Sequence, residues 1–285
     1  NRKPEGVYVA NPGYLLSKAA IPRGAVIVDM DGMAVKTLDD FEAALSDLAD
    51  GERVKVRFVN MENPQNSVVR LLEMNRIWFP AKRCTRNDAT GSWPCRDLAE
   101  GPPAEATKIG STRLNKYDDR RLNKIAPSLV VVTFDLPYTL SGVSERHYYG
   151  TGLIVDKDRG YVIVDRNTVP VAIGDVKITF AGSLEVNAKI EQLHPLHNFA
   201  IVSYDPKSIG DTPVQNAEFN TAPLLPGDDV LVVGIKGDHQ LVHQQSTVSS
   251  VDPLILPLSR TLRFRDSNIE GIDLVTAPTD FDGVL

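Results

Sequence analysis

Cysteine and histidine are scarce in this sequence, and it has no long apolar run. The 285 residues include two cysteines, Cys84 and Cys95, and five histidines. Two thiols cannot close a structural zinc site, which takes four ligands. Apolar runs such as 129–132 (LVVV) are far shorter than the roughly 18 residues of a membrane-spanning helix. We therefore expect no metal centre at the cysteines and no membrane association, and nothing in the sequence calls for a cofactor.

Basic charge is not in excess either. The chain has 31 Lys and Arg against 37 Asp and Glu, which gives a net charge of −6. Nucleic-acid-binding proteins usually present a basic face to the phosphates, whereas the basic clusters here are interleaved with or flanked by aspartates. With 42% apolar and 24% charged residues, the composition is that of an ordinary globular protein. We expect protein or peptide partners, with self-association among them, and no nucleic acid.

The state of the two cysteines depends on where the protein resides. The chain starts with Asn1 and no leader follows, so we interpret it as an internal segment of a longer protein. An intracellular, soluble protein is the default interpretation. That location favours two reduced thiols over a disulfide, which would form in an oxidising compartment. We therefore expect Cys84 and Cys95 to be reduced.

Three regions follow one another along the chain. Residues 1–76 predict a small α+β domain, with strands at 6–10, 24–30, 53–58 and 68–74, a helical turn at 17–21 and a helix that begins near Thr37. Residues 77–126 are punctuated by Pro and Gly and read as a linker, which Trp78 and Trp93 would anchor to a domain surface. From residue 127 to 285, short strands recur at regular spacing, which is typical of an all-β barrel architecture.

Several stretches carry a family resemblance. The first region contains GVYVANPG, AAIPRGAVIVDMDGMAV, LDDFEAAL and DGERVKVRF, and the last contains GTGLIVD, HPLHNFAIV, GDDVLVVGI and DGVL. Together they resemble the PDZ domain and the chymotrypsin-like protease domain of Deg/HtrA proteases. RNDATGSWPC and VDRNTVPV are similar to the second half of the double-length eukaryotic type. The resemblance implies a mainly β protein: a PDZ domain at 1–76, and a trypsin-like double β-barrel at 127–285 that is truncated in its second barrel.

The same resemblance assigns three degenerate catalytic positions. The family's histidine, aspartate and serine motifs match 164–168, 198–201 and 279–285, which places Asn167, Asn198 and Phe281 where the triad belongs. An amide has no basic nitrogen and a phenyl ring is no nucleophile. Ser267, Thr276 and Thr279 lie near the serine position but have no paired histidine there. A directly hydrolytic module with a non-standard dyad is the alternative.

The remaining expectations concern ligands and the longer protein. His194 and His197 share HPLH, which is a weak metal motif and more typical of a turn before a strand. PDZ domains bind peptide ends as an added strand. The strand that precedes GVYVA in the family is not in this chain. The first region could therefore either bind peptides or serve only as a spacer between domains. The resemblance implies an active serine endopeptidase domain upstream, further strands beyond Leu285, and a nuclear rather than a chloroplast location. We expect a non-catalytic region that scaffolds, binds partners or regulates that protease.

Overall fold

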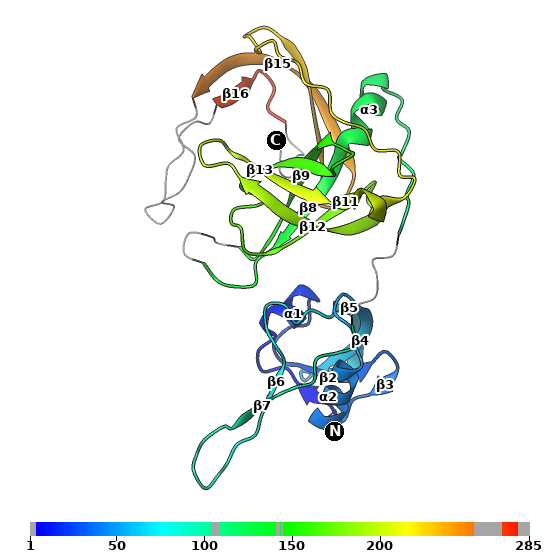
Figure 1. The fold of residues 1–285 in the computed structure, drawn as a ribbon, viewed down its shortest axis with the longest axis vertical. Helices are drawn as coiled ribbons and strands as arrows, with labels where there is room; N and C mark the ends of the chain where they lie inside the picture. Colours follow the sequence, from blue (N-terminus) through cyan, green and yellow to red (C-terminus); the bar gives the residue numbers. More distant parts are fainter. Residues whose placement is uncertain (1–3, 104–108, 141–142, 144, 254–269, 279–285) are drawn as a thin grey trace. The chain divides into compact units, whose positions relative to one another are not determined.

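The computed structural model describes residues 4–103, 109–140, 143, 145–253 and 270–278. The chain divides into two compact units, 1–107 and 108–285. Figure 1 shows the ribbon of each unit. No helix in the described ranges is long and apolar enough to cross a membrane.

The first unit is an antiparallel sheet with two helices. The sheet has the order β1-β2-β4-β5, with β3 paired to β2. Its elements are β1 (Val7–Tyr8), α1 (Gly13–Lys18), β2 (Ala25–Met30), β3 (Met33–Ala34), α2 (Leu38–Ser46), β4 (Arg53–Asn60) and β5 (Asn63–Glu73). The strands confirm the predicted ones, whereas the helical turn expected at 17–21 begins earlier, as α1. Ile21, Ile27, Val56 and Leu72 are fully buried in its core.

Helix α2 begins at the residue that the sequence indicates. Thr37 Oγ1 accepts a hydrogen bond of 3.2 Å from the backbone N–H of Asp40, and Asp40 Oδ2 accepts one of 2.9 Å from the N–H of Thr37. This reciprocal pair is a capping box, which satisfies two donors that a helix start leaves open. The N–H groups of Lys36 and Thr37 lower the pKa of the Asp40 carboxyl. The predicted helix start is therefore confirmed.

The predicted linker contains regular structure in both units. In the first unit, β6 (Lys82–Cys84) and β7 (Cys95–Asp97) pair as a hairpin, and the second unit begins with α3 (Arg120–Ile125). The pairing sets Cys84 opposite Cys95, and the two form a disulfide. The expectation of reduced thiols is therefore wrong, because the strand pairing brings the two residues together. Trp93 is 60% exposed and does not anchor the segment as expected, while Trp78 is partly buried.

The second unit is built on a closed six-stranded barrel. The strands follow the order β10-β13-β12-β11-β8-β9 around the barrel. They are β8 (Leu129–Asp135), β9 (His147–Asp156), β10 (Tyr161–Asp165), β11 (Asp175–Phe180), β12 (Leu184–Leu193) and β13 (Phe199–Tyr204). These strands agree with the short, regularly spaced strands expected after residue 127. Phe134, Ile154, Ile178 and Phe180 fill the interior, so the barrel is a packed core.

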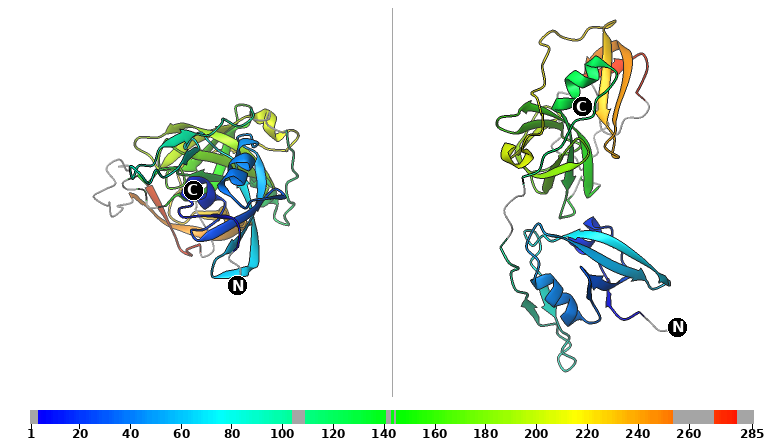
Figure 2. Two further views of the ribbon diagram at one scale, coloured as in Figure 1. Left: turned by 90° about the horizontal axis from the view of Figure 1, so that it is seen from below. Right: turned by 90° about the vertical axis from the view of Figure 1, so that its right-hand side faces the viewer.

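A three-stranded sheet lies beside the barrel (Figure 2). It consists of β14 (Asp229–Ile235), β15 (Leu241–Pro253) and β16 (Glu270–Leu274), all antiparallel. The backbone N–H of Ile235 donates a hydrogen bond of 2.9 Å to Thr151 Oγ1 of β9, which ties this sheet to the barrel. In the described part of the chain, the second set of strands forms an open sheet rather than a second barrel. The unit also contains two short 3-10 turns, Ala126–Ser128 and Pro206–Ile209.

Candidate functional site

Asn167 and Asn198 lie at the same end of the barrel. Strand β10 ends at Asp165, strand β13 begins at Phe199, and the antiparallel register places these two residues opposite each other. The turn that follows β10 carries Asn167, and the turn that precedes β13 carries Asn198. The structure thus brings two of the three predicted positions to neighbouring turns. The third, Phe281, lies outside the described residues.

The turn that carries Asn167 is fixed by a buried carboxylate. Asp165 is 6% exposed, and its Oδ1 accepts hydrogen bonds from the N–H groups of Asn167 (2.7 Å) and Thr168 (3.1 Å). Its Oδ2 accepts a third bond of 2.6 Å from the Thr168 hydroxyl. A buried carboxylate with its oxygens satisfied in this way holds the local backbone in one conformation. Asn167 is therefore presented on the exposed side of a rigid turn.

Gly150, in the GTGLIVD stretch, makes room for this turn. A Cβ atom built at residue 150 would overlap Thr168 Oγ1 and stand 3.3 Å from Asp165 Oδ2. A larger residue would displace the buried hydrogen bonds, because protein interiors leave no spare volume for an extra methyl group. The glycine in this stretch therefore serves the packing of strand β9 against the turn.

Arg166 links the two turns. Its Nη1 donates a hydrogen bond of 3.0 Å to the backbone oxygen of His194, and its Nη2 donates one of 3.4 Å to that of Pro170. Guanidinium donors are always charged and have a fixed fork geometry, so one side chain can hold two carbonyls. The turn before β13 is thus fixed relative to the turn after β10.

His194 is engaged in its own turn. Its Nδ1 accepts hydrogen bonds from the N–H groups of Leu196 (3.2 Å) and His197 (2.9 Å), and its ring stacks on Phe199 with centroids 4.6 Å apart. These hydrogen bonds and the stacking hold the ring within its own turn. The turn predicted for HPLH is confirmed. Among the described residues, no group of three His, Cys, Asp or Glu side chains is arranged to hold a metal ion.

Of the three hydroxyl residues near the predicted serine position, only Thr276 is described. Its backbone N–H donates to Ser246 Oγ (3.1 Å), and its backbone oxygen accepts from the same hydroxyl (3.0 Å). Ser246 is buried, and its hydroxyl joins strand β15 to the residues that follow β16. Ser267 and Thr279 lie outside the described residues.

A histidine–aspartate pair was missed by the sequence analysis. His147 Nδ1 lies 2.8 Å from Asp135 Oδ1, and the two residues are cross-strand partners on β9 and β8. Asp135 is 8% exposed, whereas the His147 side chain is 63% exposed. A carboxylate on Nδ1 is the arrangement that orients a histidine base. The pair depends on the register between β8 and β9, which the sequence does not specify.

Comparison with known proteins finds relatives along nearly the whole chain. No family model matches the chain. A PDZ domain-containing protein of Schizosaccharomyces pombe is 32% identical over 272 residues, which cover 94% of this chain and 27% of that protein. The pro-apoptotic serine protease nma111 of Aspergillus oryzae is 31% identical over 98% of this chain and 27% of its own length. Its Saccharomyces cerevisiae counterpart is 31% identical over 88% of this chain and 25% of its own length. Over nearly its whole length, the chain is homologous to the C-terminal part of these nma111-type double HtrA/PDZ proteases.

The Deg/HtrA relationship extends over both units, because the alignments cover nearly the whole chain. The chain spans about a quarter of the length of these relatives. Two solved structures are similar to part of the chain. The HtrA-type protease AlgW with a tripeptide has a TM-score of 0.38 and 13% identity, and covers 53% of this chain and 43% of its own. Deg5 has a TM-score of 0.41 and 13% identity, and covers 57% of this chain and 74% of its own.

Proposed function

We propose that this chain is a non-catalytic region of an HtrA-like serine endopeptidase: a PDZ-like domain followed by a degenerate trypsin-like (pseudo-protease) domain. Its role is to act as a scaffold, to bind partners, or to regulate an active protease domain elsewhere in the longer protein. The process that this protease serves is protein quality control. Its partners are proteins or peptides, other copies of the chain included. A soluble, nuclear protein fits this role.

The observation that carries the proposal is the fixed turn at Asn167. In the family that the sequence resembles, this position holds the histidine that acts as general base. The hydrogen bonds to Asp165 hold the turn in one conformation. An asparagine amide has no lone pair that can take a proton from a serine at neutral pH. Because the turn is rigid, another side chain cannot easily move into the same place.

The PDZ-like assignment of the first unit is supported by its order of elements. The strands β2 and β3, the capped helix α2 and the two closing strands β4 and β5 follow one another, in the order that the family resemblance implies. The S. pombe relative is itself described as a PDZ domain-containing protein. Strand β1 is an edge of the sheet, where a peptide would add as a further strand. A spacer role without peptide binding is the competing possibility for this unit.

A second candidate function is favoured by the His147–Asp135 pair. An oriented histidine is half of a hydrolytic dyad, and the exposed side chain of His147 is accessible to a substrate. The missing half is a hydroxyl or thiol nucleophile within hydrogen-bond reach of its other ring nitrogen. This candidate would make the chain a hydrolase in its own right.

Hydrolysis of denatured β-casein by the purified full chain separates the two functions. The proposal expects no cleavage above buffer for the wild-type chain or for the Asn167→Ala and His147→Ala variants. Cleavage that His147→Ala abolishes and Asn167→Ala leaves unchanged would establish the second function. Cleavage that Asn167→Ala abolishes would contradict the assignment of Asn167 as a degenerate position.

A further inference from the structure

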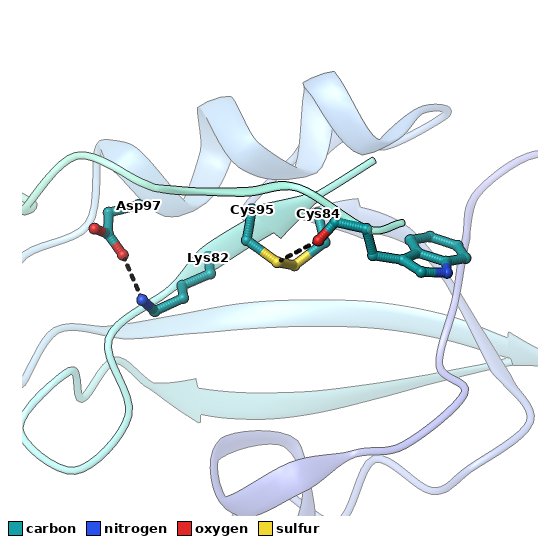
Figure 3. Close-up of a disulfide and its surroundings, with 5 residues drawn as sticks. Lys82, Cys84, Cys95 and Asp97 are labelled. Atoms are coloured by element: carbon teal, nitrogen blue, oxygen red, sulfur yellow. Dashed lines mark hydrogen bonds and ion pairs between the residues drawn. A yellow bond between two sulfur atoms is a disulfide. The ribbon is translucent and has the colours of Figure 1, made fainter. Parts of the chain in front are cut away.

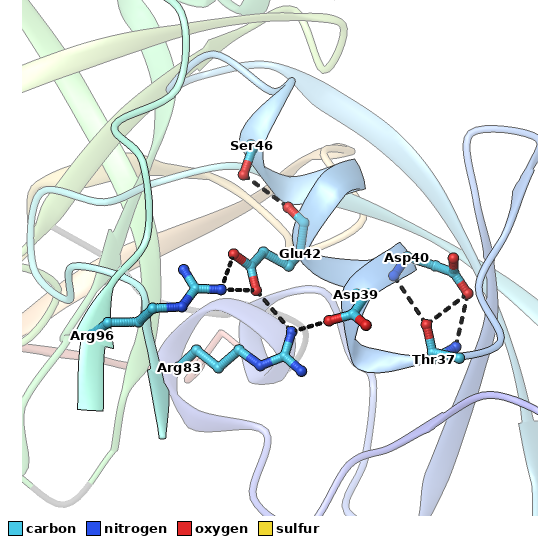
Figure 4. Close-up of polar contacts among 7 residues, drawn as sticks. All are labelled: Thr37, Asp39, Asp40, Glu42, Ser46, Arg83 and Arg96. Atoms are coloured by element: carbon cyan, nitrogen blue, oxygen red, sulfur yellow. Dashed lines mark hydrogen bonds and ion pairs between the residues drawn. The ribbon is translucent and has the colours of Figure 1, made fainter. Parts of the chain in front are cut away.

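The β6–β7 hairpin of the first unit is held to helix α2 by ion pairs (Figure 4). Arg83 of β6 contacts the carboxylate of Asp39, and its Nη1 lies 2.9 Å from Glu42 Oε2. Arg96 of β7 places its Nη2 2.5 Å and 2.7 Å from the two oxygens of Glu42. The guanidiniums of Arg96 and Arg83 lower the pKa of the Glu42 carboxyl. Both arms of the hairpin therefore meet at one acidic side chain of α2.

These arginines would repel each other without Glu42. The strand register places Arg83 directly opposite Arg96, so their like charges lie on one face of the hairpin. Like charges directly across a strand pair are destabilising, and an isolated two-stranded hairpin is marginal in water. The Lys82–Asp97 ion pair is largely exposed and adds little. The hairpin therefore depends on further interactions that hold its two strands together.

The next position along the hairpin holds the disulfide (Figure 3). Cys84 and Cys95 are opposite each other, 11 residues apart in sequence, and both are exposed. A disulfide restricts the open states of the segment that it closes. Because both cysteines are exposed, a thiol reductant can reach the bond.

The chain that follows the hairpin reaches the other end of α2. The N–H of Leu98 donates to the Ala81 oxygen (2.9 Å), which extends the pairing beyond β7. Gly101 then packs against the Leu48 oxygen so closely that a Cβ there would overlap it. Arg76 lies at the same place and donates to the oxygens of Leu45 (2.7 Å) and Leu48 (3.0 Å). The segment 82–101 therefore contacts α2 near both of its ends.

We propose that the β6–β7 hairpin is a redox-controlled cover on helix α2. In the oxidised chain the disulfide keeps Arg83 and Arg96 side by side on Glu42. A dithiol reductant opens the bond: its thiolate attacks one cysteine sulfur, its second thiol resolves the mixed disulfide, and it leaves oxidised while Cys84 and Cys95 become thiols. The reduced hairpin has lost the crosslink between its strands and is held to α2 by its ion pairs with Asp39 and Glu42, so it opens more readily and the acidic side of α2 becomes accessible. Such reversible disulfides are typical of redox-sensing proteins in reducing compartments.

Hydrogen exchange of the intact chain, with and without dithiothreitol, tests this proposal. Reduction should raise exchange in peptides that contain 82–97 by about tenfold or more, because the local opening becomes less costly. Peptides from β2 and β4 should keep their protection. The Cys84→Ser/Cys95→Ser double variant should show the fast exchange without reductant and no response to it.

Glu42→Gln tests the role of the helix in the same assay. This variant should raise exchange in 82–97 even in the oxidised chain, whereas Glu62→Gln, at an exposed turn of the same unit, should leave it unchanged. Three outcomes would overturn the proposal: two free thiols found by alkylation in the untreated chain, equal exchange of the hairpin in both redox states, or an increase shared equally by β2 and β4. The last would mean that the disulfide stabilises the whole unit and not a local cover.

Discussion

The carboxylate of Asp165 and the hydroxyl of Thr168 are joined by a hydrogen bond of 2.6 Å, inside the turn that displays Asn167. Both side chains are buried, and the same carboxylate accepts two backbone N–H groups of the turn. The conformation of this turn is therefore set by buried groups, independently of which residue stands at position 167. Stability measurements on the partners of Asp165 test that view.

Thr168→Val should destabilise the second unit by about 1–3 kcal/mol. The substitution keeps the shape of the side chain but leaves the buried Asp165 oxygen without its donor, and an unsatisfied buried acceptor costs free energy of this size. Urea unfolding of the full chain, followed for the second unit, measures the change. Thr221→Val, at an exposed loop position, is the matched control and should stay within about 0.5 kcal/mol. Equal effects of both variants would mean that the turn is not held by this bond.

Gly150→Ala should destabilise the same unit by about 1–3 kcal/mol through overpacking. The new Cβ overlaps Thr168 Oγ1, so the cost should depend on the side chain at position 168. In a double-mutant cycle with Thr168→Ala, which removes the overlapping atom, the combined loss should be smaller than the sum of the single losses. Additive losses would show that the glycine serves another purpose.

Tyr204 gives the barrel a pH dependence in the alkaline range. Its ring packs edge-on against Phe180 in the core, and its hydroxyl has no hydrogen-bond partner among the residues that the structure describes. Burial raises the pKa of the phenol to about 12, above its ordinary value near 10. Between these two values the unfolded chain loses the proton while the folded chain keeps it. The free energy of unfolding should therefore fall with rising pH, by at most about 1.4 kcal/mol per unit.

Tyr204→Phe isolates this contribution. The variant should be as stable as wild type or more so at pH 8, because it removes a buried hydroxyl without a partner. The difference in the free energy of unfolding between the variant and wild type should increase between pH 10 and pH 11. In this range only wild type contains the Tyr204 phenol, which destabilises the folded chain as the pH rises. Urea unfolding at pH 8, 10 and 11 measures both. A constant difference across this range would mean that the folded-state pKa of Tyr204 is not raised.

Strands whose residues alternate between buried and exposed could be predicted from the sequence alone. In β4, buried Val54 and Val56 alternate with exposed Arg53 and Lys55, and this period-two pattern depends on the strand alone. The start of α2 was equally local, since the Thr37 capping box spans four residues. Such features need no knowledge of the rest of the fold.

Features that depend on pairing across the chain were missed. The β6–β7 hairpin consists of three-residue strands with mostly polar side chains, so no pattern marked it, and the state of its cysteines followed from that omission. The His147–Asp135 pair requires the register between β8 and β9, which the sequence does not specify. Asn167 and Asn198 were assigned to the catalytic positions from the family resemblance, and the periodicity of the sequence did not indicate them.

The most direct test of the proposed lack of catalysis is labelling of the purified chain with a serine-reactive fluorophosphonate, read as the increase in intact mass. Trypsin labelled in parallel confirms the reagent. We expect no adduct on the native chain, because no histidine base is assigned to the position that Asn167 occupies. A stoichiometric adduct on the native chain that is absent after unfolding, and that a single Ser→Ala substitution removes, would contradict the proposal and establish an active hydrolase.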